Sequence, residues 1–86
     1  MFKHAKRLAQ RRIAGELFIV DPANRCLHQP QGAGDFLWEC LARGSSEEYL
    51  VEKLTAEFDV PKDRAARDVR RFLAELRRKK LIEEAR

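Results

Sequence analysis

The sequence contains few of the residues from which catalytic and metal sites are usually built. It has two histidines, His4 and His28, and two cysteines, Cys26 and Cys40, and their spacing matches no common metal or redox motif. No Ser-based nucleophile motif is present. Residues 32–34 read Gly-Ala-Gly, but the Lys-Ser/Thr pair of a phosphate-binding loop does not follow. We therefore predict no catalytic residues, no metal ligands, no cofactor and no enzymatic activity.

Long apolar runs are also missing. No stretch approaches the roughly 20 apolar residues that a transmembrane helix needs, and the basic residues 1–12 are not followed by the apolar segment of a signal peptide. Two cysteines without a disulfide framework fit a reducing compartment. We therefore expect a cytoplasmic protein that does not contact a membrane.

The length and charge of the chain limit its organisation. Its 86 residues, 44% of them hydrophobic, predict a single folded domain over residues 1–86. The formal net charge is +4, and the basic residues gather in segments 1–12 and 62–80. This distribution makes an acidic partner plausible without saying which kind.

The first half of the chain has the pattern of a β-meander. Residues Glu16–Val20 are rich in β-branched and aromatic side chains. Asp21–Asn24 is a good turn sequence, after which Arg25–His28 is expected to pair back as one edge of the sheet. Residues 8–13 fit either a frayed helix or a first strand. We interpret the region as a three-stranded antiparallel sheet in which Cys26 and His28 share a face.

Three amphipathic helices follow without another strand between them. The apolar spacing predicts helices over 33–43, from Ser45 to Phe58, and over 61–80, with Ser45 and Glu48 as a capping box. Residues 81–82 are expected to fold back onto the core. The fold class is therefore α+β. The expected core residues of the helices are Leu37, Trp38, Leu41, Leu50, Val51, Leu54, Phe58, Ala65, Val69, Phe72, Leu73 and Leu76.

An arginine stripe on the last helix leaves three interpretations open. It consists of Arg64, Arg67, Arg71 and Arg78. The stripe could follow the phosphates of a nucleic acid, bind an acidic peptide, or be a solvated face. Asp68 and Glu75 lie three or four positions away from these arginines, so local pairing is expected to neutralise much of their charge. No aromatic residue alternates with them, which argues against a site for single-stranded nucleic acid.

The order of these parts resembles the PqqD family. The resemblance covers about residues 10–84 and rests on the order and spacing of several short segments rather than on one specific motif. These are Leu17–Asp21 with its turn, Gly34 four residues before Trp38–Leu41, Gly44–Leu50, Glu57–Val60, the positions Asp68, Val69, Phe72, Leu73 and Leu76, and Lys80–Glu83.

The resemblance implies a winged-helix-like fold and a non-catalytic peptide chaperone. Such proteins bind the leader of a ribosomally made precursor peptide and present it to a modifying enzyme, typically a radical SAM protein, as in PQQ or related biosynthesis. The leader adds to the third strand and lies against the last helix. By position, the implied peptide-binding residues are Arg25, Cys26, Leu27, His28, Val69, Arg70, Leu73, Ala74 and Arg77.

The alternative function is a winged-helix DNA-binding regulator that uses the basic last helix. Strands that precede all the helices, and acids that interrupt the basic helix, make nucleic acid the weaker choice of partner. The sequence leaves monomer and dimer open, because an exposed strand edge allows strand exchange.

Overall fold

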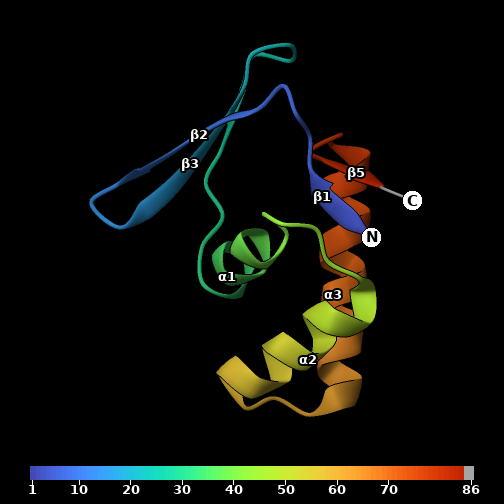
Figure 1. The fold of residues 1–86 in the computed structure, drawn as a ribbon. Coiled ribbons are helices and arrows are strands. Elements are labelled where there is room, and N and C mark those ends of the chain that lie inside the picture. The colour runs from blue at the N-terminus through green and yellow to red at the C-terminus, as the bar shows by residue number, and fades with distance from the viewer. Residues whose placement is uncertain (85–86) are drawn as a thin grey trace.

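The computed structural model describes residues 1–84 of the chain. Figure 1 shows a small sheet and a second pair of strands on one side of three helices. No helix in the described part of the chain is long and apolar enough to span a membrane. The elements are, in order, β1 (Phe2–His4), β2 (Ala9–Ile13), β3 (Glu16–Asp21), β4 (Cys26–His28), α1 (Ala33–Cys40), α2 (Glu47–Phe58), α3 (Lys62–Arg78) and β5 (Ile82–Glu84).

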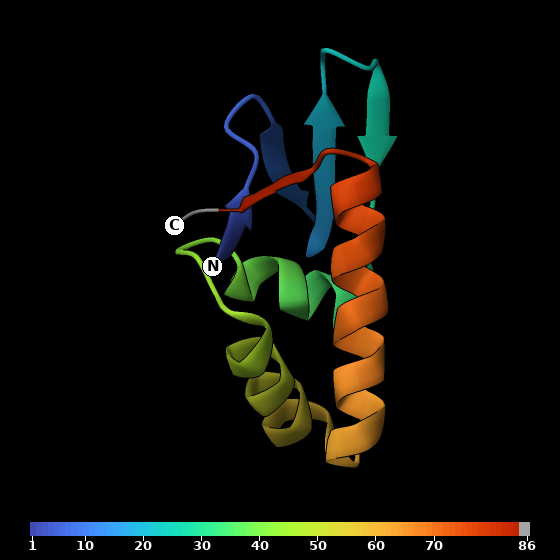
Figure 2. The same cartoon turned by 90° about the vertical axis from the view of Figure 1, so that its right-hand side faces the viewer.

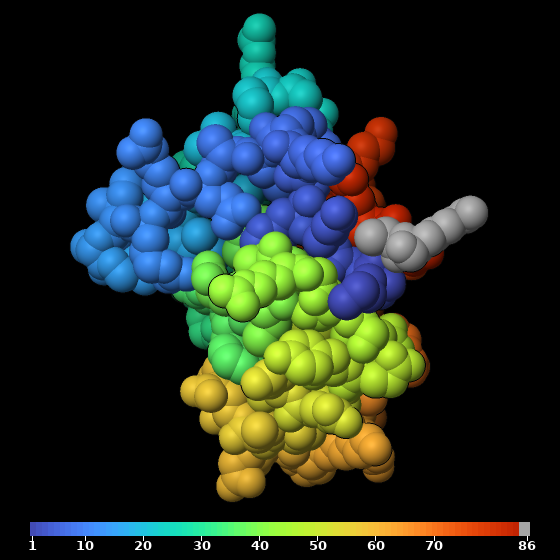
Figure 3. Space-filling view, in the orientation of Figure 1, coloured from blue at the N-terminus to red at the C-terminus, as the bar shows by residue number. Residues whose placement is uncertain are grey.

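Strands β2, β3 and β4 form the predicted antiparallel meander. Of the two readings of residues 8–13, the strand is confirmed, and Ala9 pairs with Val20 across it. Strand β4 begins at Cys26 rather than at Arg25, because Arg25 has a φ of 53° and still belongs to the turn. Along β3 the side chains alternate between core and solvent, as a half-buried strand requires. Figure 3 shows the β2–β3 hairpin projecting from the body of the molecule.

A second, two-stranded sheet was not predicted. Strand β1 pairs with β5, so that His4 lies opposite Ile82, and Phe2 also forms a bridge with Ser45. The expected folding back of residues 81–82 is confirmed, since Leu81 and Ile82 are buried. These strands join the two ends of the described chain on one side of α3 (Figure 2).

The helices follow the predicted apolar pattern, with two corrections at α2. Its N-cap is Ser46, whose Oγ accepts a hydrogen bond from the Tyr49 amide at 3.1 Å, not Ser45. Ser45 is instead buried, and its hydroxyl donates to the Cys40 carbonyl. Phe58 is 42% exposed rather than buried, because its ring packs edge-on against Phe36 near the surface. Helix α1 ends at Cys40, three residues before the predicted end.

Trp38 lies at the centre of the core, as expected, and is fully buried. Its indole Nε1 donates to the Gln10 side-chain oxygen at 2.9 Å. The Gln10 amide in turn donates to His4 Nδ1, and His4 Nε2 donates to the Trp38 carbonyl. The His4 ring also stacks on the indole with centroids 3.8 Å apart. This closed network connects β1, β2 and α1 and satisfies every polar atom that it buries.

Candidate functional site

A groove lies between the edge strand β4 and helix α3. Strand β4 pairs only with β3 among the described strands, so its other edge is open. In Figure 2, β4 lies beyond the C-terminal end of α3, and the two elements run in opposite directions. The cavity between them has a volume of about 340 Å³. Its lining comprises Ile19, Leu27, His28, Gln29, Pro30, Gly34, Phe72, Glu75, Leu76, Lys79 and Leu81.

The middle of the groove is apolar. Ile19, Leu76 and Leu81 are buried beneath it, and the Phe72 ring is half-buried against the same core cluster. A β-carbon added to Gly34 would lie 3.7 Å from Phe72 Cε1, which is ordinary contact. Gly34 therefore lies next to the Phe72 ring at the groove.

The open edge forms one wall of this groove. His28 is paired with Ile19, so its side chain shares the face of the sheet that is directed toward the core. Leu27 is paired with Val20 on the outer face and is 62% exposed. A row of unpaired backbone groups on such an edge is a template for another extended chain. The site therefore combines backbone hydrogen-bonding capacity with an apolar pocket.

A second cavity of about 270 Å³ continues the groove toward the C-terminal end of α3. His28 and Lys79 line both cavities. The lining of the second one is Asp21, Asn24, Cys26, His28, Arg78, Lys79 and Lys80. Its rim is thus basic, whereas the middle of the groove is apolar.

Asp21 supports this end of the groove from within. Its carboxylate accepts hydrogen bonds from Arg7 at 3.1 and 2.9 Å and from the Asn24 side chain at 2.8 Å. The Arg7 bonds, followed by the Asn24 bond, hold the pKa of Asp21 well below its usual range. Arg7 also donates to the Lys80 carbonyl at 2.8 Å. The β3–β4 turn is thereby connected to the end of α3.

The strand residues predicted for the site lie at the groove or next to it. Leu27 and His28 line the groove itself, and Cys26 lines the adjoining basic cavity. Arg25 lies in the turn before β4. The structure therefore brings three of the four predicted strand residues to this edge, and their contact with a peptide stays a prediction.

The helix residues predicted for the site are not brought together in the groove. Val69 and Leu73 are buried in the core, and the exposed residues Arg70, Ala74 and Arg77 do not line the cavity. The Arg77 guanidinium lies 6.0 Å from the centroid of the Phe2 ring, on the β1 side of the helix. Their proposed role in peptide binding stays untested.

The groove is lined instead by Phe72, Glu75, Leu76 and Lys79. These four residues are spaced three and four apart, so they form one face of α3. Sequence reasoning included Phe72 and Leu76 in the core stripe and missed their position at the groove. The available signal was the aromatic Phe72 at the margin of that stripe.

The arginine stripe of α3 is partly neutralised, as expected. Arg64 pairs with Asp68 at 4.0 Å, and Glu75 pairs with Lys79 at 3.2 Å and with Arg78 at 3.7 Å. All of these pairs are well exposed, so each contributes about 0–1 kcal/mol at most. Within residues 1–84, Arg67 and Arg71 have no ion pair.

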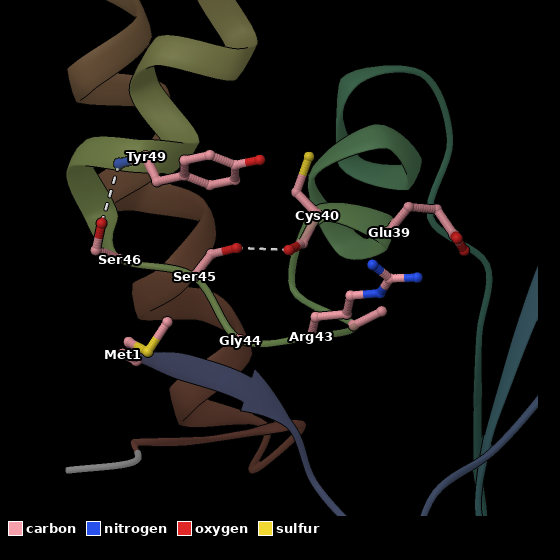
Figure 4. Close-up of a pocket in the computed structure, with 9 residues that line it drawn as sticks. Met1, Glu39, Cys40, Arg43, Gly44, Ser45, Ser46 and Tyr49 are labelled. Carbon is pink, nitrogen blue, oxygen red and sulfur yellow. Dashed lines mark hydrogen bonds between the residues drawn. The ribbon is translucent and has the colours of Figure 1, made fainter.

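A larger cavity of about 690 Å³ lies between the end of α1 and the start of α2. Figure 4 shows Cys40, Ser45, Ser46 and Tyr49 around it. Burial raises the pKa of the Cys40 thiol, which keeps the thiol protonated and a weak nucleophile. In the described part of the chain, no group of three or more His, Cys, Asp and Glu side chains could hold a metal ion. This cavity therefore offers no recognisable chemistry.

Comparisons with known proteins concern the family and the fold of the chain. A family model described as coenzyme PQQ synthesis protein D (PqqD) matches residues 16–82. The structure is similar to TbiB1, solved in complex with the TbiA(beta) leader peptide, with a TM-score of 0.87, 25% sequence identity and coverage of 98% of each chain. It also shares its fold with lasso peptide synthetase B1 complexed with its leader peptide, with a TM-score of 0.85, 17% identity and coverage of 96% and 98% of the two chains. No curated protein sequence matches the chain.

Proposed function

Because the chain belongs to the PqqD family, we propose that it binds the leader of a ribosomally made precursor peptide and presents that peptide to a modifying enzyme. Proteins of this family are non-catalytic peptide-binding domains, which agrees with the prediction that the chain is not an enzyme. The observation that carries the proposal is the open edge of β4 beside the apolar groove.

The leader binds by adding a strand to the sheet. Its backbone forms hydrogen bonds with the open edge of β4, which gives affinity for any extended chain. Its side chains alternate, so every second one is directed toward α3. An apolar side chain at such a position contacts Phe72 and Leu76 in the groove. Affinity then comes from the edge and selectivity from the pocket.

The contact surface on α3 is the face that lines the groove. In this proposal Phe72, Leu76 and Lys79 form the helix wall of the groove, and peptide contacts by the helix residues that the family resemblance implies stay a prediction. Arg70 and Arg77 lie on the other side and are left for contacts outside the groove. The proposed peptide contacts of β4 remain Cys26, Leu27 and His28.

The modifying enzyme acts as a separate partner in this proposal. Because proteins of this family are non-catalytic peptide-binding domains, the chain supplies recognition and another protein supplies the chemistry. A radical SAM enzyme, as in the synthesis of PQQ and related products, is the partner that the family suggests. By binding both the precursor and that enzyme in the cytoplasm, the chain raises the effective concentration of the precursor at the enzyme.

Selection from a phage-displayed library of random peptides tests the proposal. Peptides enriched on the purified chain are titrated into isotope-labelled protein, and amide shifts are followed by NMR. We expect the shifts to be confined to β4 and to residues 72–79 of α3.

The competing function is tested with the same protein. Duplex DNA is titrated at two salt concentrations, because each phosphate contact steepens the salt dependence. Failure to enrich any peptide, together with DNA binding that depends on Arg64, Arg67 and Arg71, would overturn the proposal in favour of a DNA-binding regulator.

A further inference from the structure

The basic end of the groove carries more positive charge than the rest of the site. Arg78, Lys79 and Lys80 line the second cavity. The carboxylate of Asp21 in the same cavity is occupied by Arg7 at 2.9 Å. Within residues 1–84, the acid that pairs with these cations is Glu75, which pairs with Arg78 and Lys79. An excess of cations therefore faces a ligand at this point.

The position of this charge relative to the apolar pocket follows from the directions of the elements. Cys26 lies beside residues 78–80, whereas Pro30 lies beside Phe72. Helix α3 therefore runs opposite to β4, as Figure 2 shows. A peptide that pairs with β4 in the antiparallel sense, the commoner one in sheets, runs parallel to α3. Its later residues then reach the basic end.

The spacing between the two subsites fits a strand. Leu76 lies in the apolar part of the groove, and Lys80 lies at the basic rim. Lys79, the C-cap of α3, lies three residues or roughly 4.5 Å along the axis beyond Leu76, and Lys80 follows it outside the helix. Two strand residues advance by roughly 6.6 Å and have their side chains on the same face. The residue two positions after the apolar anchor therefore lies next to the cations.

We propose that the groove selects leaders in which an acidic residue stands two positions C-terminal to an apolar anchor. The inference rests on the proposed function and adds a specificity to it. The anchor contacts Phe72 and Leu76, and the carboxylate contacts Lys79 and Lys80, with His28 between the two subsites. Specificity thus depends on two exposed lysines that directly follow the last residue of α3.

The displayed library of random peptides also tests this inference, with three forms of the protein. The first is the wild type. The second is the double variant Lys79→Gln and Lys80→Gln, which removes two charges at the basic end. The third is Arg64→Gln and Arg67→Gln, which removes two exposed charges from the N-terminal half of the same helix, away from both cavities. Thermal melting verifies that each variant is folded.

The expected result is a consensus of an apolar residue and, two positions later, Asp or Glu. This acidic preference disappears with the lysine variant and persists with the arginine variant. The apolar preference persists with both variants. Fluorescence titration of one enriched peptide should show roughly tenfold weaker binding to the lysine variant, the scale of one charge-assisted hydrogen bond.

Three results would overturn the inference and leave the proposed function intact. They are enrichment of apolar residues without an acid, an acid enriched on the N-terminal side of the anchor, and an acidic preference that survives in the lysine variant. Enrichment of no peptide at all would overturn the proposed function and the inference together. The two failures are therefore distinguishable in one experiment.

Discussion

Replacing Phe72 with alanine should weaken peptide binding by removing one wall of the apolar pocket. The half-buried ring lines the groove and packs on the core cluster. An aromatic side chain buries roughly 150–250 Å² when it is fully covered, and we take roughly 50 Å² of the Phe72 ring as the accessible area that a ligand can still cover. An apolar ligand side chain gives up about the same area, so roughly 100 Å² leaves water.

At about 25 cal/mol per Å² this area corresponds to about 2.5 kcal/mol. Only part of such a term appears in measured affinity, because ordering the ligand costs free energy. We therefore expect a loss of about 1–2 kcal/mol, or roughly 5- to 30-fold in Kd. The substitution also removes packing from the edge of the core, which should lower the free energy of unfolding by about 1–3 kcal/mol.

The assay is fluorescence titration of a library-selected peptide, with circular dichroism as the test of folding. Phe58→Ala is the matched control. Phe58 is 42% exposed, contacts Phe36 and does not line the groove, so its loss should leave Kd unchanged. A folded Phe72→Ala protein with wild-type affinity would refute the assignment of the ligand to this pocket.

Three further changes test other parts of the structure. Leu27→Pro should abolish peptide binding, because proline removes a backbone donor from the edge strand; normal binding by a variant with an intact dichroism spectrum would contradict the edge model. Burial lowers the pKa of His4, although its hydrogen bond to the Trp38 carbonyl acts in the opposite direction. The folded state therefore favours the neutral ring. The stability that this ring contributes should be lost as the pH falls below the pKa of histidine in the unfolded chain, about 6.5. Urea unfolding at pH 7.5 and pH 5 (about 1 unit above and about 1.5 units below that value) should show a smaller difference for His4→Phe than for the wild type, and an equal difference would show that His4 is not responsible. Ser46→Ala should lower the free energy of unfolding by about 1 kcal/mol through loss of the α2 cap, whereas Ser46→Asp, which keeps an acceptor, should not.

The local elements and most of the core could be predicted from the sequence, because their physical causes are local. The alternation of Leu17 and Ile19 defines the buried face of β3, and the 3.6-residue spacing of Val69, Leu73 and Leu76 defines that of α3. The boundaries were less certain. Ser45 and Ser46 are both good caps, and only the bridge between Phe2 and Ser45 removes the first from that role.

The pairing of β1 with β5 was beyond sequence reasoning. Each strand has three residues, too few to show a periodic pattern, and the partners come from opposite ends of the chain. Their pairing is decided by packing on α3 and by the network of His4, Gln10 and Trp38. Such contacts exist only after the helices have assembled.

The candidate site shows the same division between local and tertiary information. The open edge of β4 followed from the meander and its turn, and the sequence resemblance placed the leader between this strand and α3. Which side of α3 faces β4 depends on the rotation of the helix, and each residue turns it by about 100°. A shift of one or two positions along α3 therefore moves a side chain into or out of the groove. Phe72 and Lys79 line the groove, whereas their near neighbours Leu73 and Arg77 do not. The sequence alone determined that an apolar stripe and basic residues share this helix, but only the packing of α3 against α2, β5 and the core decided which of them line the groove.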